Sequence, residues 1–167
     1  MQDDFIGAFE AVEHLVGNGY TKIAHIAGPQ GMVFTERRVQ GYLAALQKNN
    51  FPVRREWIIY SGFSQQDGEA DTYRLLDGEE RPDAIFAAND RKAIGAMLAL
   101  KARNIQIGKE IGVVGFTNDP MSAIITPTLT TVAEPAFEMG RESCELLIKH
   151  IKKKNFIPEE KVFPAKL

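Results

Sequence analysis

The stretch PDAIFAANDRKAIGAMLALKARN, residues 82–104, decides the fold of this chain. Its apolar run 84–88 ends abruptly at Asn89 and Asp90, and apolar residues then recur at helical spacing. This pattern predicts a buried strand followed at once by a helix. The two polar residues either cap that helix or face a ligand at the carboxyl end of the strand, and the residues alone leave both readings open.

The same alternation of an apolar strand and an amphipathic helix occurs four times along the chain. The predicted strands are TKIAHIAGPQG (21–31), EWIIYSGFS (56–64), DAIFAAND (83–90) and EIGVVGFTND (110–119), and the predicted helices cover 5–16, 35–50, 65–82 and 91–104. Repeated strand–helix units predict an α/β fold with a doubly wound parallel sheet that has helices on both faces. We expect this lobe to span residues 5–125.

The pattern changes after residue 125. The segment ITPTLTTVAEP (125–135) contains two prolines and repeated threonines, so it predicts an extended chain. AFEMGRESCELLIKHIKKK (136–154) predicts a strong helix for which the chain offers no obvious packing partner, and FIPEEKVFPAKL (156–167) predicts a last short strand.

Composition narrows the class of protein. The chain has 167 residues with 44% hydrophobic and 25% charged side chains, typical of a globular protein with one domain or slightly more. Its net charge of −2 provides no general attraction to nucleic acid, and its single cysteine, Cys144, cannot form an internal disulfide. The chain contains no apolar run of about 18 residues, so the sequence predicts no membrane span. The start, MQDDFIGAFEAVEHL, lacks the basic segment of a signal peptide.

Motifs of catalysis and cofactor binding are missing from the sequence. It contains no G-x-G-x-x-G, no phosphate-binding loop with its lysine and no G-x-S-x-G. His14, His25 and His150 lack metal-ligand spacing, so we expect structural roles for them. We therefore predict no catalytic residues, no metal and no cofactor, and a protein that is not an enzyme.

Better candidates for a site follow the predicted strands. Polar or aromatic residues stand at all four carboxyl ends: residues 35–38 including Arg38, then Phe63, then Asn89 and Asp90, and finally Thr117, Asn118 and Asp119. Ligands of open parallel sheets collect at this edge. A ring, a guanidinium, amides and carboxylates together suit a polyhydroxylated ligand. The alternative is that Asn89 and Asp90 only cap a helix while Phe63 fills a gap in the core, and the residues do not decide between the two.

Several segments in this order resemble the C-terminal part of the effector-binding core of LacI/GalR-family transcriptional repressors. The matching segments are GAFEAVEHLVGNGYTKIAHIAGP (7–29), RRVQGYLAAL (37–46), PDAIFAANDRKAIGAMLAL (82–100), IQIGKEIGVVGFTN (105–118) and PTLTTVAEPAFEMGRESCELLIKHI (127–151). The resemblance implies a periplasmic-binding-protein-like core of type I, with an effector between two lobes. Residues 5–125 would be the C-terminal lobe. Residues 126–167 would supply a crossover strand, the long helix 136–152 of the N-terminal lobe and a terminal strand.

The resemblance also assigns roles to individual residues. Arg38 matches the effector-binding arginine, Phe63 the aromatic residue that stacks on the effector, and Asn89 the polar residue that ends the third strand. Asp90 would start the helix or line the cleft. On this assignment, Arg38→Ala should abolish effector binding with little loss of stability.

The fourth strand departs from the family pattern. An aspartate commonly follows Gly-Tyr/Phe there, whereas Thr117 follows Phe116 in this chain. Asn118 or Asp119 would have to replace the missing carboxylate, and a different effector is expected.

The function implied by the resemblance is that of a cytoplasmic bacterial regulator that senses a sugar or small metabolite. It would act as a homodimer, with contacts around 63–76 and 91–103, and would bind DNA only through a helix-turn-helix absent from this chain. Met1 would then not be the natural start. The alternatives are a periplasmic sugar-binding protein of a transport system, which shares the fold, and a Rossmann-like enzyme, which the missing glycines disfavour.

Overall fold

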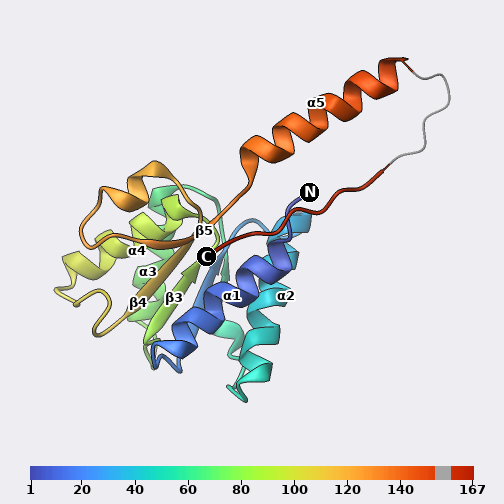
Figure 1. The fold of residues 1–167 in the computed structure, drawn as a ribbon. Coiled ribbons are helices and arrows are strands. Elements are labelled where there is room, and N and C mark those ends of the chain that lie inside the picture. Colours follow the sequence, from blue (N-terminus) through green and yellow to red (C-terminus); the bar gives the residue numbers. More distant parts are fainter. Residues whose placement is uncertain (153–158) are drawn as a thin grey trace.

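A five-stranded parallel sheet forms the centre of the computed structural model, which describes residues 1–152 and 159–167 (Figure 1). The strand order is β2-β1-β3-β4-β5, and every pair of neighbours is parallel. The strands are β1 (Ile23–Ala27), β2 (Ile58–Tyr60), β3 (Ala84–Ala87), β4 (Gly112–Thr117) and β5 (Thr130–Ala133). The predicted doubly wound α/β fold is therefore confirmed.

Two pairs of helices cover the sheet. Helices α1 (Asp4–Gly17) and α2 (Val33–Lys48) pack on one face, and α3 (Gln65–Leu76) and α4 (Asp90–Ala102) pack on the other (Figure 1). Each face has its own apolar cluster, in which Ile85 of β3 belongs to one and Phe86 to the other. This alternation follows from the side chains of a strand pointing to opposite faces.

The stretch 82–104 folds as its pattern predicts. All four residues of β3 are buried, and only two residues separate the end of this strand from the start of α4 at Asp90. Asn89 is the N-cap, and its side chain accepts a hydrogen bond from the backbone N–H of Lys92 at 2.8 Å. The abrupt change from apolar to polar residues therefore marks both the strand end and the helix start.

The structure adds detail that the patterns did not predict. A short 3₁₀ helix, η1 (Arg55–Trp57), leads into β2, which is only three residues long. Helix α2 begins at Val33, two residues before the expected start at position 35. A second 3₁₀ helix, η2 (Pro120–Ala123), connects β4 to the extended segment.

Helix α5 (Ala136–Lys152) leaves the body formed by the sheet and its four covering helices. β5 pairs with β4, and α5 then extends away from the sheet with none of its residues buried (Figure 1). In place of the predicted terminal strand, residues 159–167 form isolated bridges, from Phe163 to Gln2 and from Lys166 to Ala133. Residues 156–158 of that prediction lie outside the described residues. Of the helices the structure describes, none is long and apolar enough to cross a bilayer.

Candidate functional site

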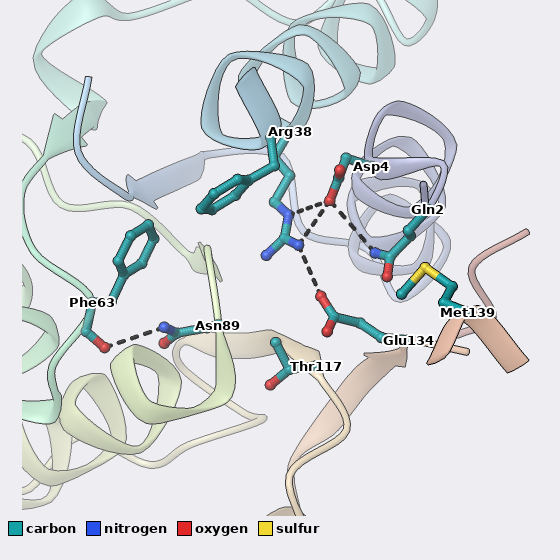
Figure 2. A pocket seen from close by; sticks show the side chains of 9 residues that line it. Gln2, Asp4, Arg38, Phe63, Asn89, Thr117, Glu134 and Met139 are labelled. Atoms are coloured by element: carbon teal, nitrogen blue, oxygen red, sulfur yellow. Dashed lines mark hydrogen bonds and ion pairs between the residues drawn. The ribbon is translucent and has the colours of Figure 1, made fainter. Parts of the chain in front are cut away.

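A pocket of about 360 Å³ opens at the carboxyl edge of the sheet (Figure 2). Its lining residues are Gln2, Asp4, Phe34, Arg38, Phe63, Asn89, Thr117, Glu134 and Met139. Four of the seven residues predicted from the sequence thus meet here: Arg38, Phe63, Asn89 and Thr117. Arg38, Phe63 and Asn89 follow β1, β2 and β3, and Thr117 is the last residue of β4. The parallel arrangement brings these strand ends to one edge.

The guanidinium of Arg38 is the centre of the pocket. The residue is 6% exposed, and its guanidinium contacts the carboxylate oxygen Oδ1 of Asp4 through Nε at 2.9 Å and Nη2 at 2.7 Å. Nη2 also donates to Glu134 Oε1 at 2.9 Å, and Nη1 donates to the carbonyl oxygen of Ala88 at 2.5 Å. Three N–H groups of the guanidinium make these hydrogen bonds, and the contact of Nη2 with Asp4 is an ion pair, so one N–H on Nη1 is left for a ligand.

Aromatic rings support this guanidinium. Its central carbon lies 3.7 Å from the ring centroid of Phe116 and 5.4 Å from that of Phe34. Phe34 in turn stacks against Phe63, with ring centroids 5.6 Å apart. The pocket therefore combines a flat cation with an aromatic wall, the pair of surfaces that suits a ring-shaped ligand bearing hydroxyl groups.

Phe63 reaches the pocket from the loop between β2 and α3. The next residue, Ser64, caps α3 in a reciprocal capping box with Asp67. On its other side the ring fills the space beside Gly28, where an added Cβ would lie 2.2 Å from Phe63 Cε1. A side chain at position 28 would therefore displace the ring.

Asn89 combines the two roles that its position in the sequence left open. Its Oδ1 caps α4, while its Nδ2 donates to the carbonyl oxygen of Phe63 at 3.1 Å (Figure 2). One amide N–H and a lone pair of Oδ1 remain for a ligand. Capping the helix and facing the pocket are thus not exclusive.

The structure does not bring Asp90, Asn118 and Asp119 into the lining. Asp90 is fully buried, and burial raises the pKa of its carboxyl group. It accepts hydrogen bonds from Thr131 Oγ1 and from the backbone N–H of Asp119, both at 2.6 Å. Asp119 caps η2 through the backbone N–H of Met121 at 2.9 Å. The carboxylates of Asp90 and Asp119 therefore hold the backbone at the edge of the pocket without lining it.

This network holds an unusual backbone at the end of β4. Thr117 has φ +111° and Asn118 has φ +52°, in a region that is strained for a β-branched residue. The backbone N–H of Asn118 donates to Thr131 Oγ1 at 3.2 Å, and Thr131 is bound to Asp90. The strained turn is thus tied to β5 and α4.

Five lining residues were missed by reasoning from the sequence: Gln2, Asp4, Phe34, Glu134 and Met139. Asp4 is an acidic residue in the first turn of α1, a position that the helix dipole favours without any ligand. Glu134 follows β5 directly, so the rule of the strand ends applied to a fifth strand would have found it. With these two, the pocket holds two carboxylates against one guanidinium.

The residues that the structure describes contain no cluster of side chains suited to a metal ion. His25 lies in the core, where its Nδ1 donates to the carbonyl oxygen of Phe86 at 3.0 Å and its ring stacks on that residue at 4.5 Å. Burial lowers the pKa of His25 to about 3. This histidine has the structural role predicted for it.

Comparison with known proteins places this geometry in a family. The family model described as a periplasmic binding protein-like domain matches residues 12–167. The HTH-type transcriptional repressor CytR of Escherichia coli (strain K12) is 34% identical over 146 residues, which are 87% of this chain and 43% of CytR. The chain therefore spans less than half the length of this relative.

Solved structures show the same likeness. A regulatory protein of the LacI family from Chloroflexus aggregans superposes with a TM-score of 0.92 at 34% identity, covering 99% of this chain and 59% of that one. The transcriptional regulator CelR, solved as a cellobiose complex, superposes with a TM-score of 0.94 at 32% identity, covering 98% of this chain and 50% of that one. The chain thus belongs to the periplasmic binding protein-like domain family, in the form found in LacI-family regulators.

Proposed function

We propose that this chain is the effector-sensing part of a LacI-family transcriptional regulator, and that its effector is a sugar or a similar small polyhydroxylated metabolite. The observation that carries the proposal is the pocket in which Arg38, Phe63, Asn89 and Thr117 meet at the carboxyl edge of the sheet. The likeness to CelR, solved with cellobiose, supports the chemical class. The regulator is not an enzyme and works in the cytoplasm, where its DNA is.

The contacts in the pocket suggest how an effector is held. Phe63 covers the apolar face of a sugar ring, and the free N–H groups of Arg38 and Asn89 donate to hydroxyl or ring oxygens. Thr117 offers a hydroxyl in place of a carboxylate. Asn118, Asp119 and Asp90 act on the effector only through the backbone that they hold.

The remainder of the core is proposed to complete the pocket from the other side. Residues 5–125 are one lobe, and residues 126–167 cross to a second lobe that packs on α5. Support comes from α5 itself, where Phe137, Leu147 and Ile151 are 78%, 59% and 77% exposed. Large apolar side chains at helical spacing on one element are typical of a face that packs against protein.

Effector binding is proposed to act on DNA through the equilibrium between lobe arrangements. Its effect on operator affinity cannot exceed the difference in its affinity for the two arrangements. The DNA-binding helix-turn-helix lies outside this chain. The regulator acts as a homodimer, with contacts around 63–76 and 91–103, and the 39% exposure of Leu98 on α4 supports this surface. Leu98→Lys should therefore convert a dimer to a monomer in analytical ultracentrifugation.

The alternative of a periplasmic sugar-binding protein would use the same pocket. CytR is a transcriptional repressor and the Chloroflexus aggregans protein is a LacI-family regulatory protein, which favours the regulator. An N-terminal secretion signal on the full-length protein would instead favour transport.

The decisive experiment is an effector screen on the full-length protein. Calorimetry with neutral mono- and disaccharides, sugar phosphates and nucleosides should find a compound that binds, and the same compound should change operator affinity. Phe63→Ala should weaken its binding. A panel in which nothing binds, or a bound compound without effect on operator affinity, would refute the proposal.

A further inference from the structure

A buried charged cluster lies beside the pocket, between α3, α4 and the loop that follows β2. Lys92 is fully buried, and its Nζ donates to Asp71 Oδ2 at 2.6 Å, to the hydroxyl of Ser61 and to the carbonyl oxygen of Gly62 at 3.0 Å. Ser61 also donates to Asp71 Oδ2, at 2.5 Å. All three N–H groups of the ammonium are thus used within the protein.

Stability alone is a poor reason for this cluster. Removing two charges from water costs several kcal/mol per ion, and apolar residues of similar shape often do as well or better. Burial accordingly lowers the pKa of Lys92, and the hydrogen bond and charge of Asp71 oppose that shift. The ammonium does what an apolar side chain cannot, because it holds a backbone carbonyl oxygen of the loop.

The loop is held at consecutive residues by the first turn of α4. Lys92 binds the carbonyl oxygen of Gly62, and Asn89 binds that of Phe63 at 3.1 Å. Asn89 also accepts the backbone N–H of Lys92, so both anchors belong to one hydrogen-bonded unit. Gly62 itself fits closely, since a Cβ there would lie 2.3 Å from Asp67 Oδ2.

We propose that Lys92 is a positioning residue. Paired with Asp71, it fixes the loop 61–64 and thereby sets the place of the Phe63 ring in the pocket. The importance of this ring for an effector rests on the proposed function, whereas its placement by Lys92 does not.

The test observes the ring directly and needs no effector. Full-length protein labelled with 4-fluorophenylalanine gives ¹⁹F signals for the ten phenylalanines of this chain, and Phe63→Leu assigns the signal of Phe63. The variant Lys92→Met/Asp71→Leu keeps the shapes of both side chains and removes both charges. Its Phe63 signal should shift and broaden while the signals of distant phenylalanines stay in place.

A second ion pair, between the C-cap residues of the same two helices and away from the loop, provides a matched control. Arg103 Nη2 and Asp77 Oδ1 form an ion pair at 2.9 Å, with side chains 47% and 56% exposed. Arg103→Met/Asp77→Leu should leave the Phe63 signal unchanged. An equal change in both variants would show a general loosening of the helix pair and overturn the proposal.

Ser61→Ala covers the case in which the buried double variant fails to fold. It retains the Lys92–Asp71 pair and the bond of Lys92 to the Gly62 carbonyl oxygen, and it removes the hydroxyl that is the second link between this pair and the loop. The Phe63 signal should again move, by less than in the double variant. An unchanged Phe63 signal in whichever of these variants folds contradicts positioning by Lys92, even if the effector screen succeeds. A failed effector screen would refute the proposed function but would not affect the conclusion that Lys92 positions the Phe63 ring.

Discussion

Replacing Arg38 with alanine should destabilise the protein by about 3–5 kcal/mol, the usual cost of removing one partner of a buried ion pair. The side chains of Arg38 and Asp4 are only 7% and 11% exposed, so the variant leaves the carboxylate of Asp4 without its cation and largely without water. Glu134 is 26% exposed at its side chain and regains water more easily. The carbonyl oxygen of Ala88 and the Phe116 ring also lose their contacts with the guanidinium.

Urea unfolding followed by circular dichroism measures this effect on the full-length protein. The neighbouring Arg37 is a matched control, because the contact described for its guanidinium is with the sulfur of Met1 at an exposed site. Arg37→Ala should change the free energy of unfolding by at most about 0.5 kcal/mol. The double variant Arg38→Ala/Asp4→Ala should be more stable than Arg38→Ala, because it removes the stranded carboxylate.

Equal unfolding midpoints for Arg37→Ala and Arg38→Ala, at equal denaturant slopes, would refute this reasoning. The resemblance to the family suggested that Arg38→Ala affects effector binding with little loss of stability. Because Arg38 is buried, we expect Arg38→Ala to lose effector binding and also to lose stability. A binding measurement on this variant must therefore be made at a temperature where it is folded.

Two further predictions concern Gly28 and His25. Gly28→Ala should displace the Phe63 ring and cost about 1–3 kcal/mol, as overpacking does, whereas Gly17→Ala, with nothing within 4 Å of its added Cβ, should be neutral or slightly stabilising in thermal unfolding. His25 has a folded pKa of about 3 against 6.5 for its ordinary value, so the folded state binds fewer protons than the unfolded state. The contribution of neutral His25 to the free energy of unfolding is complete above pH 6.5. It is lost as the pH falls toward 3, by up to about 1.4 kcal/mol per pH unit. Unfolding at pH 7.5 and 5 should show this slope in the native protein and in His14→Gln, and a smaller slope in His25→Phe; equal slopes in all three would contradict it.

The sequence by itself determined the fold class and four of the nine residues that line the pocket. The strand 84–87 is a continuous apolar run that is buried on both faces, and the helix 90–102 buries one face at helical spacing, so a local pattern is enough to predict both. Parallel strands bring their carboxyl ends together, and that rule alone placed Arg38, Phe63, Asn89 and Thr117 at one edge.

Only the tertiary structure decided which of these side chains already have hydrogen-bond or ion-pair partners within the protein. Arg38 binds Glu134, 96 positions away, and Lys92 is buried against Asp71. Asp90 turned out to support a strained turn and not to line the pocket. Such contacts depend on how helices pack against the sheet and on the register between strands. Periodicity within one element carries no information about either, because it records which face is buried and not what that face will meet.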